Sequence, residues 1–509
     1  MALLPILGGA YEARSVIAGA QRSVNLYPES NPPDSQAPVP ITHYLTPGLK
    51  RLGTPATIAG WRATYQATDG TGWGIVGPNV YFIDSLFGLT LVGVIPDSPN
   101  RPSFSDNGSV IVLVDGTPLG YAIDMASHTF GQINDAAFYG ADKADFLDTF
   151  FIFNRPGTAQ FYISLSNVSY GMLIGGAAFD PLDIAAKTGG ADPIVTLIVV
   201  HRQLWLIGSL TAEVWTDTGA ADFTFGAIPG AFTDHGCVAK YSVVSMDNAA
   251  YWLTQDRQGQ GIIVKTNDVY GLEAISTFVI DADIQSYNVI TNAIGGAYQQ
   301  QGHAFYVIAF PSADKTWQRE VSTGKWNEWA SLDNNGKLHR HRSSTWAFLY
   351  GKNVVGDFSN GKLYALDPTV YNDDGVPIVR IRSVPHIVNN GKRFEVNRLQ
   401  ADMEVGNPEG TLNKGYAGTD FNPDFNSDFG PLFAPDTIPK ITLRISMTRG
   451  ASWLEPLLQD MGAGGDYLTS ISWTRLGGNF RDAIFELSWS GDFKTALNGI
   501  FLETTGQGT

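Results

Sequence analysis

Residues 74–84 read GIVGPNVYFID, two short apolar stretches joined by Gly77, Pro78 and Asn79. Glycine, proline and asparagine favour tight turns, and short apolar or alternating runs between such turns are typical of β-strands. The segment therefore predicts a strand, a turn and a second strand that ends at Asp84. Similar pairs recur at residues 109–116 with 120–124, 149–157 with 160–163, 204–208 with 212–215, 250–253 with 261–264, 305–310 with 316–320, and 354–357 with 362–367.

These strand pairs repeat at a spacing of roughly 40–50 residues, which is the length of a β-propeller blade. A blade is a four-stranded sheet with apolar faces, and only neighbouring blades can cover those faces. Radial closure buries them and leaves only short edges. We therefore predict a β-propeller of six or seven blades over residues 56–367. A pair of stacked β-sandwiches is the structural alternative.

The composition also favours an all-β protein. Of 509 residues, 56 are glycine, 12% are aromatic, and only 16% are charged, against roughly 25% charged residues in average soluble proteins. Helices draw on Ala, Leu, Glu and Lys, whereas this mixture suits strands joined by tight turns. The low charge is explained equally well by surfaces covered by partners and by an exterior rich in Ser, Thr, Asn and Gly.

The formal net charge is −16, and this limits the function classes open to the chain. Affinity for a nucleic-acid backbone comes mainly from Lys and Arg. We therefore predict that the chain binds DNA neither tightly nor sequence-specifically. An acidic surface could still border a DNA path, because repulsion prevents sticking. Solubility alone explains the acidity too.

Cysteine content and hydropathy exclude two further classes. Cys237 is the single cysteine, so an intrachain disulfide is impossible. The strongest apolar run, residues 194–200, has the length of a strand, and a membrane helix needs roughly 20 apolar residues. We expect no membrane insertion. Residues 1–8 lack a basic flank and are expected not to act as a signal peptide.

The segments before and after the predicted propeller differ from it in composition and pattern. Residues 1–55 contain many prolines, which disfavour helix, and predict an extended N-terminal arm that is ordered only against its own body or a neighbour. Residues 368–509 predict a C-terminal β unit. Its long loop at 406–439, rich in Gly, Asn, Asp and Pro, exceeds the usual loop length and suggests an interaction role or mobility. The strands expected in this unit are 380–383, 394–405, 440–448, 470–476, 483–490 and 499–503.

Candidate chemical motifs are weak. Residues 420–429 carry a carboxylate every fourth position, but Pro423 and alternating phenylalanines favour a docked or solvated loop over a calcium site. His339 and His341, within His339-Arg340-His341-Arg342, would share one strand face but have no evident partner ligands, so a polar loop is expected there. Gly-x-Ser-x-Gly and phosphate-loop motifs are missing. We assign no catalytic, cofactor-binding or metal-binding residue and expect no cofactor.

Two segments resemble a known family. One is the arm, with residues 13–15, 20–29 and 44–49; the other comprises residues 444–446, 450–453, 472–477, 481–482 and 485–487. With the blades between them, they resemble the packaged-DNA stabilisation proteins of short-tailed bacteriophages. The run 446–453 departs from the Asp-box-like turn of those relatives at Arg449 and Ala451.

The resemblance implies a non-enzymatic tail nozzle or hub protein of the virion, assembled in the host cytoplasm. It implies a homo-oligomeric ring, usually a hexamer, beneath the head-to-tail adaptor. Such a ring extends the DNA channel, helps to retain and release the packaged genome, and contacts tail fibres or spikes and a tail needle or other channel plug. The alternatives are a propeller-type glycosidase that degrades polysaccharide and a non-catalytic glycan-binding module.

Overall fold

The computed structural model describes residues 2–4, 6–15, 18–35, 37–255, 259, 261–406, 439–462, 466–477 and 480–506. Strands account for 51% of the chain and helices for 5%, which confirms the all-β prediction. The chain divides into two compact units. The propeller unit comprises Arg51–Lys315 and Arg342–Ala365, and the sandwich unit comprises Met1–Lys50, Thr316–His341 and Leu366–Thr509. The boundaries expected at residues 55 and 367 remain a prediction about which parts fold independently.

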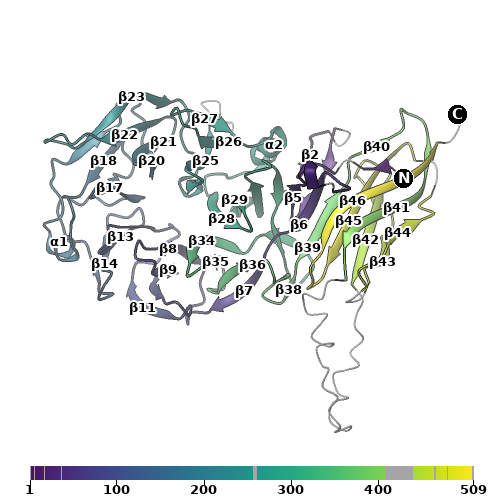
Figure 1. Cartoon of the computed structure of the whole chain (residues 1–509). Coiled ribbons are helices and arrows are strands. Elements are labelled where there is room, and N and C mark those ends of the chain that lie inside the picture. The colour runs from purple at the N-terminus through teal and green to yellow at the C-terminus, as the bar shows by residue number, and fades with distance from the viewer. Residues whose placement is uncertain are drawn as a thin grey trace, which may run out of the picture. The chain divides into compact units, whose positions relative to one another are not determined.

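Five complete four-stranded antiparallel sheets make up most of the propeller unit (Figure 1). In each sheet the first strand is innermost, and the next two strands are the pair predicted from the sequence. The blades are β8 (Trp61–Gln66), β9 (Gly72–Val76), β10 (Asn79–Ile83) and β11 (Leu89–Val94); β12 (Ser103–Asp106), β13 (Val110–Val114), β14 (Gly120–Asp124) and β15 (Phe130–Gln132); β16 (Ala144–Leu147), β17 (Phe150–Asn154), β18 (Gln160–Ile163) and β19 (Ile184–Ala186); β20 (Ile194–Val200), β21 (Gln203–Gly208), β22 (Ala212–Asp217) and β23 (Phe225–Thr233); and β24 (Val244–Met246), β25 (Ala249–Gln255), β26 (Gly261–Thr266) and β27 (Leu272–Ala274).

Two further sheets bring the number of blades to seven, within the predicted range. The sixth blade contributes two strands to the propeller unit, β28 (Ile294–Gln300) and β29 (His303–Phe310). The seventh follows the order β34 (Ser343–Leu349), β35 (Lys352–Asp357), β36 (Leu363–Asp367) and β7 (Gly48–Gly53). Short helices lie in the connections between strands: α1 (Tyr170–Gly175), α2 (Phe278–Ser286), η2 (Lys240–Ser242) and η3 (Pro311–Ala313).

Strand β13, with the sequence VIVLV, shows why the blades depend on one another. Its alternate residues face opposite sides of the sheet, yet all five are fully buried. Val110, Val112 and Val114 pack against the third blade, whereas Ile111 and Leu113 pack against the first. Strands buried on both faces read as continuous apolar runs, and this is the pattern of the predicted pairs.

The ring of blades closes between the seventh blade and the first. The indole Nε1 of Trp61 donates a hydrogen bond to the carbonyl of Gly361 at 2.7 Å. The hydroxyl of Ser344 donates to the carbonyl of Trp61 at 2.9 Å. Because β7 precedes the first blade in the chain and completes the seventh, the closure joins residues about 300 positions apart.

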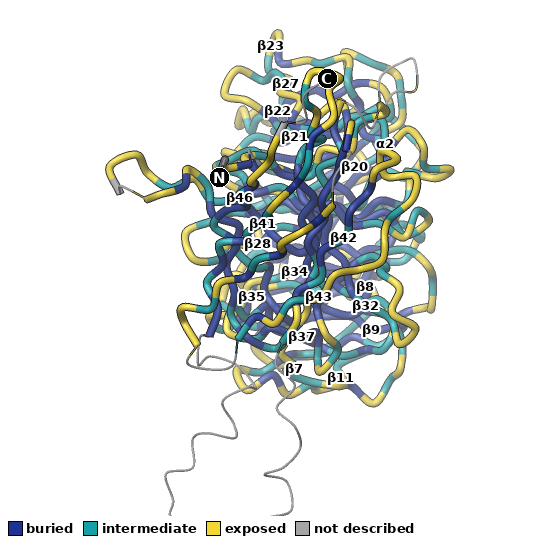
Figure 2. Tube along the Cα trace, turned by 90° about the vertical axis from the view of Figure 1, so that its right-hand side faces the viewer, coloured by how far each residue is buried: buried dark blue, intermediate teal, exposed yellow. Residues whose placement is uncertain are grey.

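The sandwich unit consists of two main sheets with a common apolar core. One sheet has the order β44-β41-β46-β6-β5, and β1 pairs with β46; the other runs through β31-β4-β39-β45-β42-β43. Figure 2 shows exposed residues gathered in turns and buried residues in strands. The strands of these two sheets are β1 (Ala2–Leu3), β4 (Ser23–Val24), β5 (Leu26–Ser30), β6 (Ile41–Leu45), β31 (Trp326–Glu328), β39 (Val379–Ser383), β41 (Phe394–Glu404), β42 (Lys440–Ser446), β43 (Leu457–Asp460), β44 (Ile471–Thr474), β45 (Asp482–Ser490) and β46 (Ala496–Gly506).

Shorter elements complete this unit. Strand β40 pairs with β45, and two small hairpins, β2–β3 and β32–β33, lie outside the main sheets. The short strands β37 and β38 pair with each other. These elements are β2 (Tyr11–Glu12), β3 (Ala20–Gln21), η1 (Pro33–Ser35), β30 (Lys315–Glu320), β32 (Ala330–Leu332), β33 (Leu338–Arg340), β37 (Asn372–Asp373), β38 (Val376–Pro377) and β40 (Ile387–Val388).

Most described residues of the predicted arm belong to the sandwich unit and contact its other segments. Asn25 is fully buried, and its side-chain amide donates to the carbonyls of Ala330 at 2.9 Å and Val379 at 2.8 Å. Its side-chain oxygen accepts from the backbone N–H of Ala330 at 2.8 Å. One asparagine thus joins three separate segments of the chain, which orders a proline-rich stretch that could not fold alone.

A buried guanidinium fixes the start of the arm. Arg382 on β39 is fully buried and donates to the carbonyls of Ile6 at 3.3 Å, Gly8 at 2.9 Å and Arg22 at 3.3 Å. Burial lowers the pKa of Arg382 to about 9. His43, also buried, hydrogen-bonds the carbonyl of Ile6 through Nε2 at 2.8 Å. Burial and the charge of Arg382 lower the pKa of His43 to about 3.

We predict that acidification destabilises the sandwich unit through His43. Because the pKa of His43 falls from 6.5 to about 3 on folding, the unfolded chain binds the extra proton between these values. Stability is complete above pH 6.5 and decreases as the pH falls, by about 2.5 kcal/mol at pH 4.5. Denaturant unfolding of wild type and His43→Gln at pH 7 and pH 4.5 should give a smaller loss in the variant. Equal losses, or the same effect in the control His303→Gln, would contradict this.

Candidate functional site at the axis of the propeller

A cavity of about 330 Å³ lies at the axis of the propeller unit. All seven innermost strands contribute to its wall, and each contributes residues at or just before its beginning. The cavity therefore occupies the end of the axis where these strands start. Lining residues include Thr64, Ser103, Lys143, Thr196, Ser245, Gly296 and Trp346.

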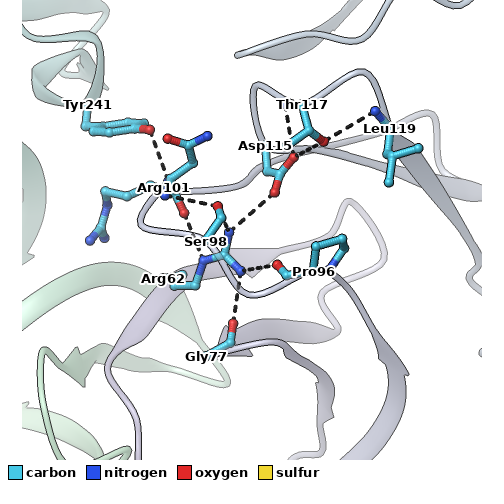
Figure 3. Close-up of polar contacts among 10 residues, drawn as sticks. Arg62, Gly77, Pro96, Ser98, Arg101, Asp115, Thr117, Leu119 and Tyr241 are labelled. Carbon is cyan, nitrogen blue, oxygen red and sulfur yellow. Dashed lines mark hydrogen bonds and ion pairs between the residues drawn. The ribbon is translucent and has the colours of Figure 1, made fainter.

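Arg62, the second residue of β8, anchors the loop between the first two blades (Figure 3). Its guanidinium donates to the carbonyls of Asn100 at 2.8 Å, Gly77 at 3.0 Å and Pro96 at 3.4 Å. It also reaches the hydroxyl of Ser98 and a carboxylate oxygen of Asp115. The side chain is 9% exposed, and burial lowers its pKa despite Asp115. These contacts engage all the N–H donors of the guanidinium, so the role of Arg62 is structural.

Arg101 and Tyr241 connect blades that are not adjacent. The backbone N–H of Arg101, before β12, donates to the hydroxyl of Tyr241 in η2 at 3.1 Å (Figure 3). The guanidinium of Arg101 donates to the hydroxyl of Ser344 at 3.3 Å and to its carbonyl. The second, fifth and seventh blades are therefore linked across the axis.

A second link joins the fifth blade to the third. Lys240 Nζ lies 2.8 Å from a carboxylate oxygen of Asp142, and the other oxygen accepts from the amide of Asn154 at 3.2 Å. Desolvation acts against the charge on Lys240, but the hydrogen bond to Asp142 leaves its pKa above the ordinary value. The lining thus holds four basic side chains, Arg62, Arg101, Lys143 and Lys240, and the single carboxylate of Asp142.

The size of the cavity excludes the passage of duplex DNA along the axis of one propeller. A sphere of 330 Å³ is roughly 9 Å across, whereas the major groove of B-form DNA alone is about 12 Å wide. Side chains that cross between blades narrow the axis further. Duplex DNA therefore cannot pass through the centre of a single propeller.

The histidines singled out in the sequence do not form a site together. His339 lies on β33 and contacts Asp333 at 3.2 Å. His341 is buried, and its ring stacks on Trp329 with centroids 3.7 Å apart. Residues 338–340 form a strand, so the expected polar loop was wrong there. Among the residues that the structure describes, no group of three or more His, Cys, Asp or Glu side chains could hold a metal ion.

The departure from the Asp-box pattern predicted at Arg449 and Ala451 was wrong, because both residues stand at variable positions of that pattern, and the turn is intact. Thr448 occupies the position of the aspartate, and its hydroxyl accepts the backbone N–H of Ser452 at 2.7 Å. The hydroxyl of Ser446 accepts the N–H of Gly450 at 2.8 Å. Arg449 pairs with Asp482 at 2.6 Å, so the turn is held to β45. The motif at residues 420–429, with most of the loop expected at 406–439, lies outside the described residues.

The basic residues of the axis were not predicted from the sequence. Arg62, Arg101 and Lys240 belong to no motif, and each lies in or beside a short innermost strand. Their common position becomes visible only when the seven innermost strands have been placed. The one available signal was basic residues near the starts of these strands in a chain of net charge −16.

Fold and axis together define a seven-bladed β-propeller whose centre is closed by polar side chains. Comparison of the sequence with known families then specifies the lineage: the chain belongs to the phage-stabilisation family, described as bacteriophage P22 Gp10, beta-propeller, which matches residues 3–371. This confirms the resemblance and the propeller fold. It makes the chain a structural protein of a bacteriophage, associated with the virion.

Comparisons with solved structures gave distant similarities. The WD40 β-propeller domain of Doa1 shares 9% identity at a TM-score of 0.38, covering 62% of this chain and 96% of that one. YCF48 from Cyanidioschyzon merolae shares 12% identity at a TM-score of 0.40, covering 63% and 99%. No curated protein matched the sequence. Within the described residues, no helix has the length and hydropathy needed to span a membrane.

We predict that Arg62→Met destabilises the propeller unit. The variant leaves Asp115 without its ion pair and three carbonyls without a donor, and breaking a buried pair costs about 3–5 kcal/mol. Differential scanning calorimetry should show a lower Tm. Arg202→Met is the control, because Arg202 is 79% exposed in its pair with Asp148 and should change the Tm little. Equal shifts in the two variants would refute the anchoring role of Arg62.

A further prediction concerns Gly296, on which the indole of Trp346 lies. A Cβ atom at Gly296 would sit 2.1 Å from the Trp346 ring, so Gly296→Ala must displace that ring and should cost about 1–3 kcal/mol. Gly171→Ala in α1 is the matched control, because a Cβ atom there meets no atom within 4 Å. Chemical denaturation followed by tryptophan fluorescence compares the two. A stability loss confined to Gly171→Ala would overturn the packing argument.

Proposed function

We propose that this chain forms a ring, the tail nozzle or hub of a short-tailed phage, which extends the DNA channel and helps to retain and release the packaged genome. The observation that carries the proposal is membership of the phage-stabilisation family over residues 3–371. The ring is a homo-hexamer beneath the head-to-tail adaptor. Its other partners are tail fibres or spikes and a needle or other channel plug, and it assembles in the host cytoplasm.

The closed axis supports a channel enclosed by several subunits. Since duplex DNA cannot pass through one propeller, a DNA path requires a space between copies. Each copy carries a net charge of −16, and six copies would carry −96. Such a wall repels phosphates and lets DNA slide without binding.

The structure narrows the part of the arm available to a neighbouring subunit. Residues from Ser23 to Gly53 contribute strands β4 to β7 and hydrogen-bond within the chain itself. The β2–β3 hairpin is different, because its strands pair with each other and lie outside the larger sheets. Tyr11 on this hairpin is 41% exposed. We therefore place the inter-subunit contact of the arm at Tyr11–Gln21.

A structural role is proposed in place of catalysis. The axial cavity holds one carboxylate, Asp142, which Lys240 already neutralises, whereas glycosidases use a pair of carboxylic residues. Incubation of the purified protein with host polysaccharide should release no reducing sugar. Detectable hydrolysis would favour the glycosidase alternative, and binding without hydrolysis would favour the glycan-binding module.

Assembly mass tests the proposal directly. The chain has a mass of 55.0 kDa, so a hexamer on the adaptor ring adds about 330 kDa, measurable by mass photometry of adaptor complexes. Deleting Glu12–Ala20, which keeps the side chain of Gln21 as an acceptor for Arg382, should weaken ring formation without lowering the Tm of the monomer. Particles that lack this protein should lose packaged DNA, whereas particles that lack only fibres should retain it. A chain that stays monomeric beside its adaptor would overturn the proposal.

A further inference from the structure

Strand β43 leaves an apolar edge exposed at one end of the sandwich unit. Among the described strands it pairs with β42 alone, and it is the last strand of its sheet. Leu458 is 60% exposed, and Leu457 and Leu454 are exposed as well. Because neighbouring residues of a strand point to opposite faces, leucine side chains reach solvent on both sides of this edge. Contiguous exposed apolar side chains usually mark an interaction site.

The backbone of β43 also has hydrogen-bonding groups available to another chain. The N–H of Met461 donates to the carbonyl of Pro439 at 2.8 Å, which fixes the register of β43 on β42. Hydrogen-bonded and non-hydrogen-bonded pairs alternate along an antiparallel ladder, so residues 457 and 459 direct their backbone groups to β42. Leu458 directs its N–H and C=O away from β42, and neither group has a partner among the residues that the structure describes. Such an edge is a template for pairing with another chain.

The charge of this edge is negative and partly uncompensated. Asp460 lies 4.0 Å from Lys440 of β42. Arg444, the other basic residue of β42, is paired with Glu486. Glu455, just before β43, is exposed and makes no hydrogen bond or ion pair within the described part of the chain. A partner of this edge should therefore bring a cation together with apolar surface.

The β2–β3 hairpin has both of these properties. Tyr11 presents an exposed aromatic ring. Glu12 and Arg22 pair at 3.8 Å, so the charge left on the hairpin is that of Arg14. Arg14 is exposed, and among the described residues it makes no hydrogen bond or ion pair. Tyrosine and arginine are also enriched among the residues that contribute most to binding at interfaces.

The spacing of the two surfaces matches. Tyr11 and Arg14 are three positions apart, and so are Leu458 and Glu455. When the two segments run antiparallel, one register sets Tyr11 against Leu458 and Arg14 against Glu455. Opposite charges and an aromatic–aliphatic contact are favourable in such cross-strand pairs.

The hairpin and β43 lie at opposite sides of the sandwich unit (Figure 1). The hairpin is fixed beside β31 and β39: the N–H of Ala10 donates to the carbonyl of Trp326 at 2.7 Å. Arg382 donates to the side-chain oxygen of Gln21 at 3.1 Å. Strand β43 is three strands away from β39 in the same sheet, a distance of about 14 Å at the usual strand spacing. Two complementary surfaces at different places of one subunit make head-to-tail contacts, which can close into a ring.

We propose that the β2–β3 hairpin of one subunit docks on the β43 edge of the next, with Tyr11 against Leu458 and Arg14 paired with Glu455. The inference rests on the proposed ring and names the surface that receives the hairpin. Pairing of two β43 edges is the competing arrangement, and it ends at a dimer. It brings two copies of the Glu455 charge together, whereas the hairpin brings the opposite charge.

Engineered cysteines test the contact, because the native Cys237 is buried. Tyr11→Cys combined with Leu458→Cys, assembled on the adaptor and treated with a short bis-maleimide, should give a ladder of linked subunits up to the closed ring on denaturing gels. Tyr11→Cys combined with Leu182→Cys is the matched control and should stay unlinked, since Leu182 is exposed in the propeller unit. Linked dimers of Leu458→Cys alone would indicate paired edges and overturn the proposal. Absence of the ladder in assembled rings would overturn it as well.

Substitutions without a cross-linker separate this contact from the ring itself. By mass photometry, Leu458→Lys should lower the yield of rings on the adaptor at least about tenfold, and Leu182→Lys should leave it unchanged. Arg14→Glu should lower the yield several-fold, and adding Glu455→Arg should restore it, because the pair is then reversed. The Tm of each monomer should equal that of wild type.

The outcomes distinguish the two proposals. Wild-type rings together with full ring formation by Leu458→Lys, or with no restoration in the charge-reversed pair, would overturn the docking of the hairpin on β43 and leave the proposed function standing. A wild-type chain that forms no ring on its adaptor would overturn the proposed function, and the docking inference with it.

Discussion

The propeller depends on the mutual burial of apolar sheet faces around one axis. A four-stranded blade with valine and isoleucine on both sides, as in β13, would expose two apolar faces to water on its own. Each face is covered by the next blade, and apolar clusters join the first blade to the second, the second to the third, the third to the fourth, the fourth to the fifth, and the seventh to the first. Since no blade is stable alone, the ring is one cooperative structure.

Crowding towards the axis explains the chemistry found there. Innermost strands converge, so several residues that line the axial cavity are small or polar, as at Thr64, Ser103 and Gly296. Arg62, Arg101 and Lys240 occupy the space that bulky apolar chains cannot fill. Arg62 donates to several loops, Arg101 donates to Ser344 of the seventh blade, and Lys240 donates to Asp142 at the start of the third. Polar closure of the axis is therefore a geometric result of seven sheets meeting, and it directs any DNA path to the outside of the single subunit.

The sequence was sufficient to predict the middle of every blade and six strands of the sandwich unit, all of them after residue 368. Runs such as Val110–Val114 and Phe394–Glu404 are long enough and apolar enough for their period to be read directly. Most of the innermost strands were missed, because small polar residues at an axis resemble loop residues. The exception is β20, whose apolar run Ile194–Val200 has the length of a strand. The course of the arm was also beyond local reasoning, since Asn25 and Arg382 act on carbonyls that lie hundreds of positions away in the chain. Such contacts leave no local pattern.

Completion of the last blade by β7 has a consequence for the order of events during synthesis. The ribosome delivers β7 first, but its neighbour β36 (Leu363–Asp367) is translated about 300 residues later. At roughly 5–20 residues per second, the leading strand waits on the order of half a minute before it can be paired. Until then the nascent protein is an open arc with an unpaired edge, so its productive folding depends on keeping that edge from other chains.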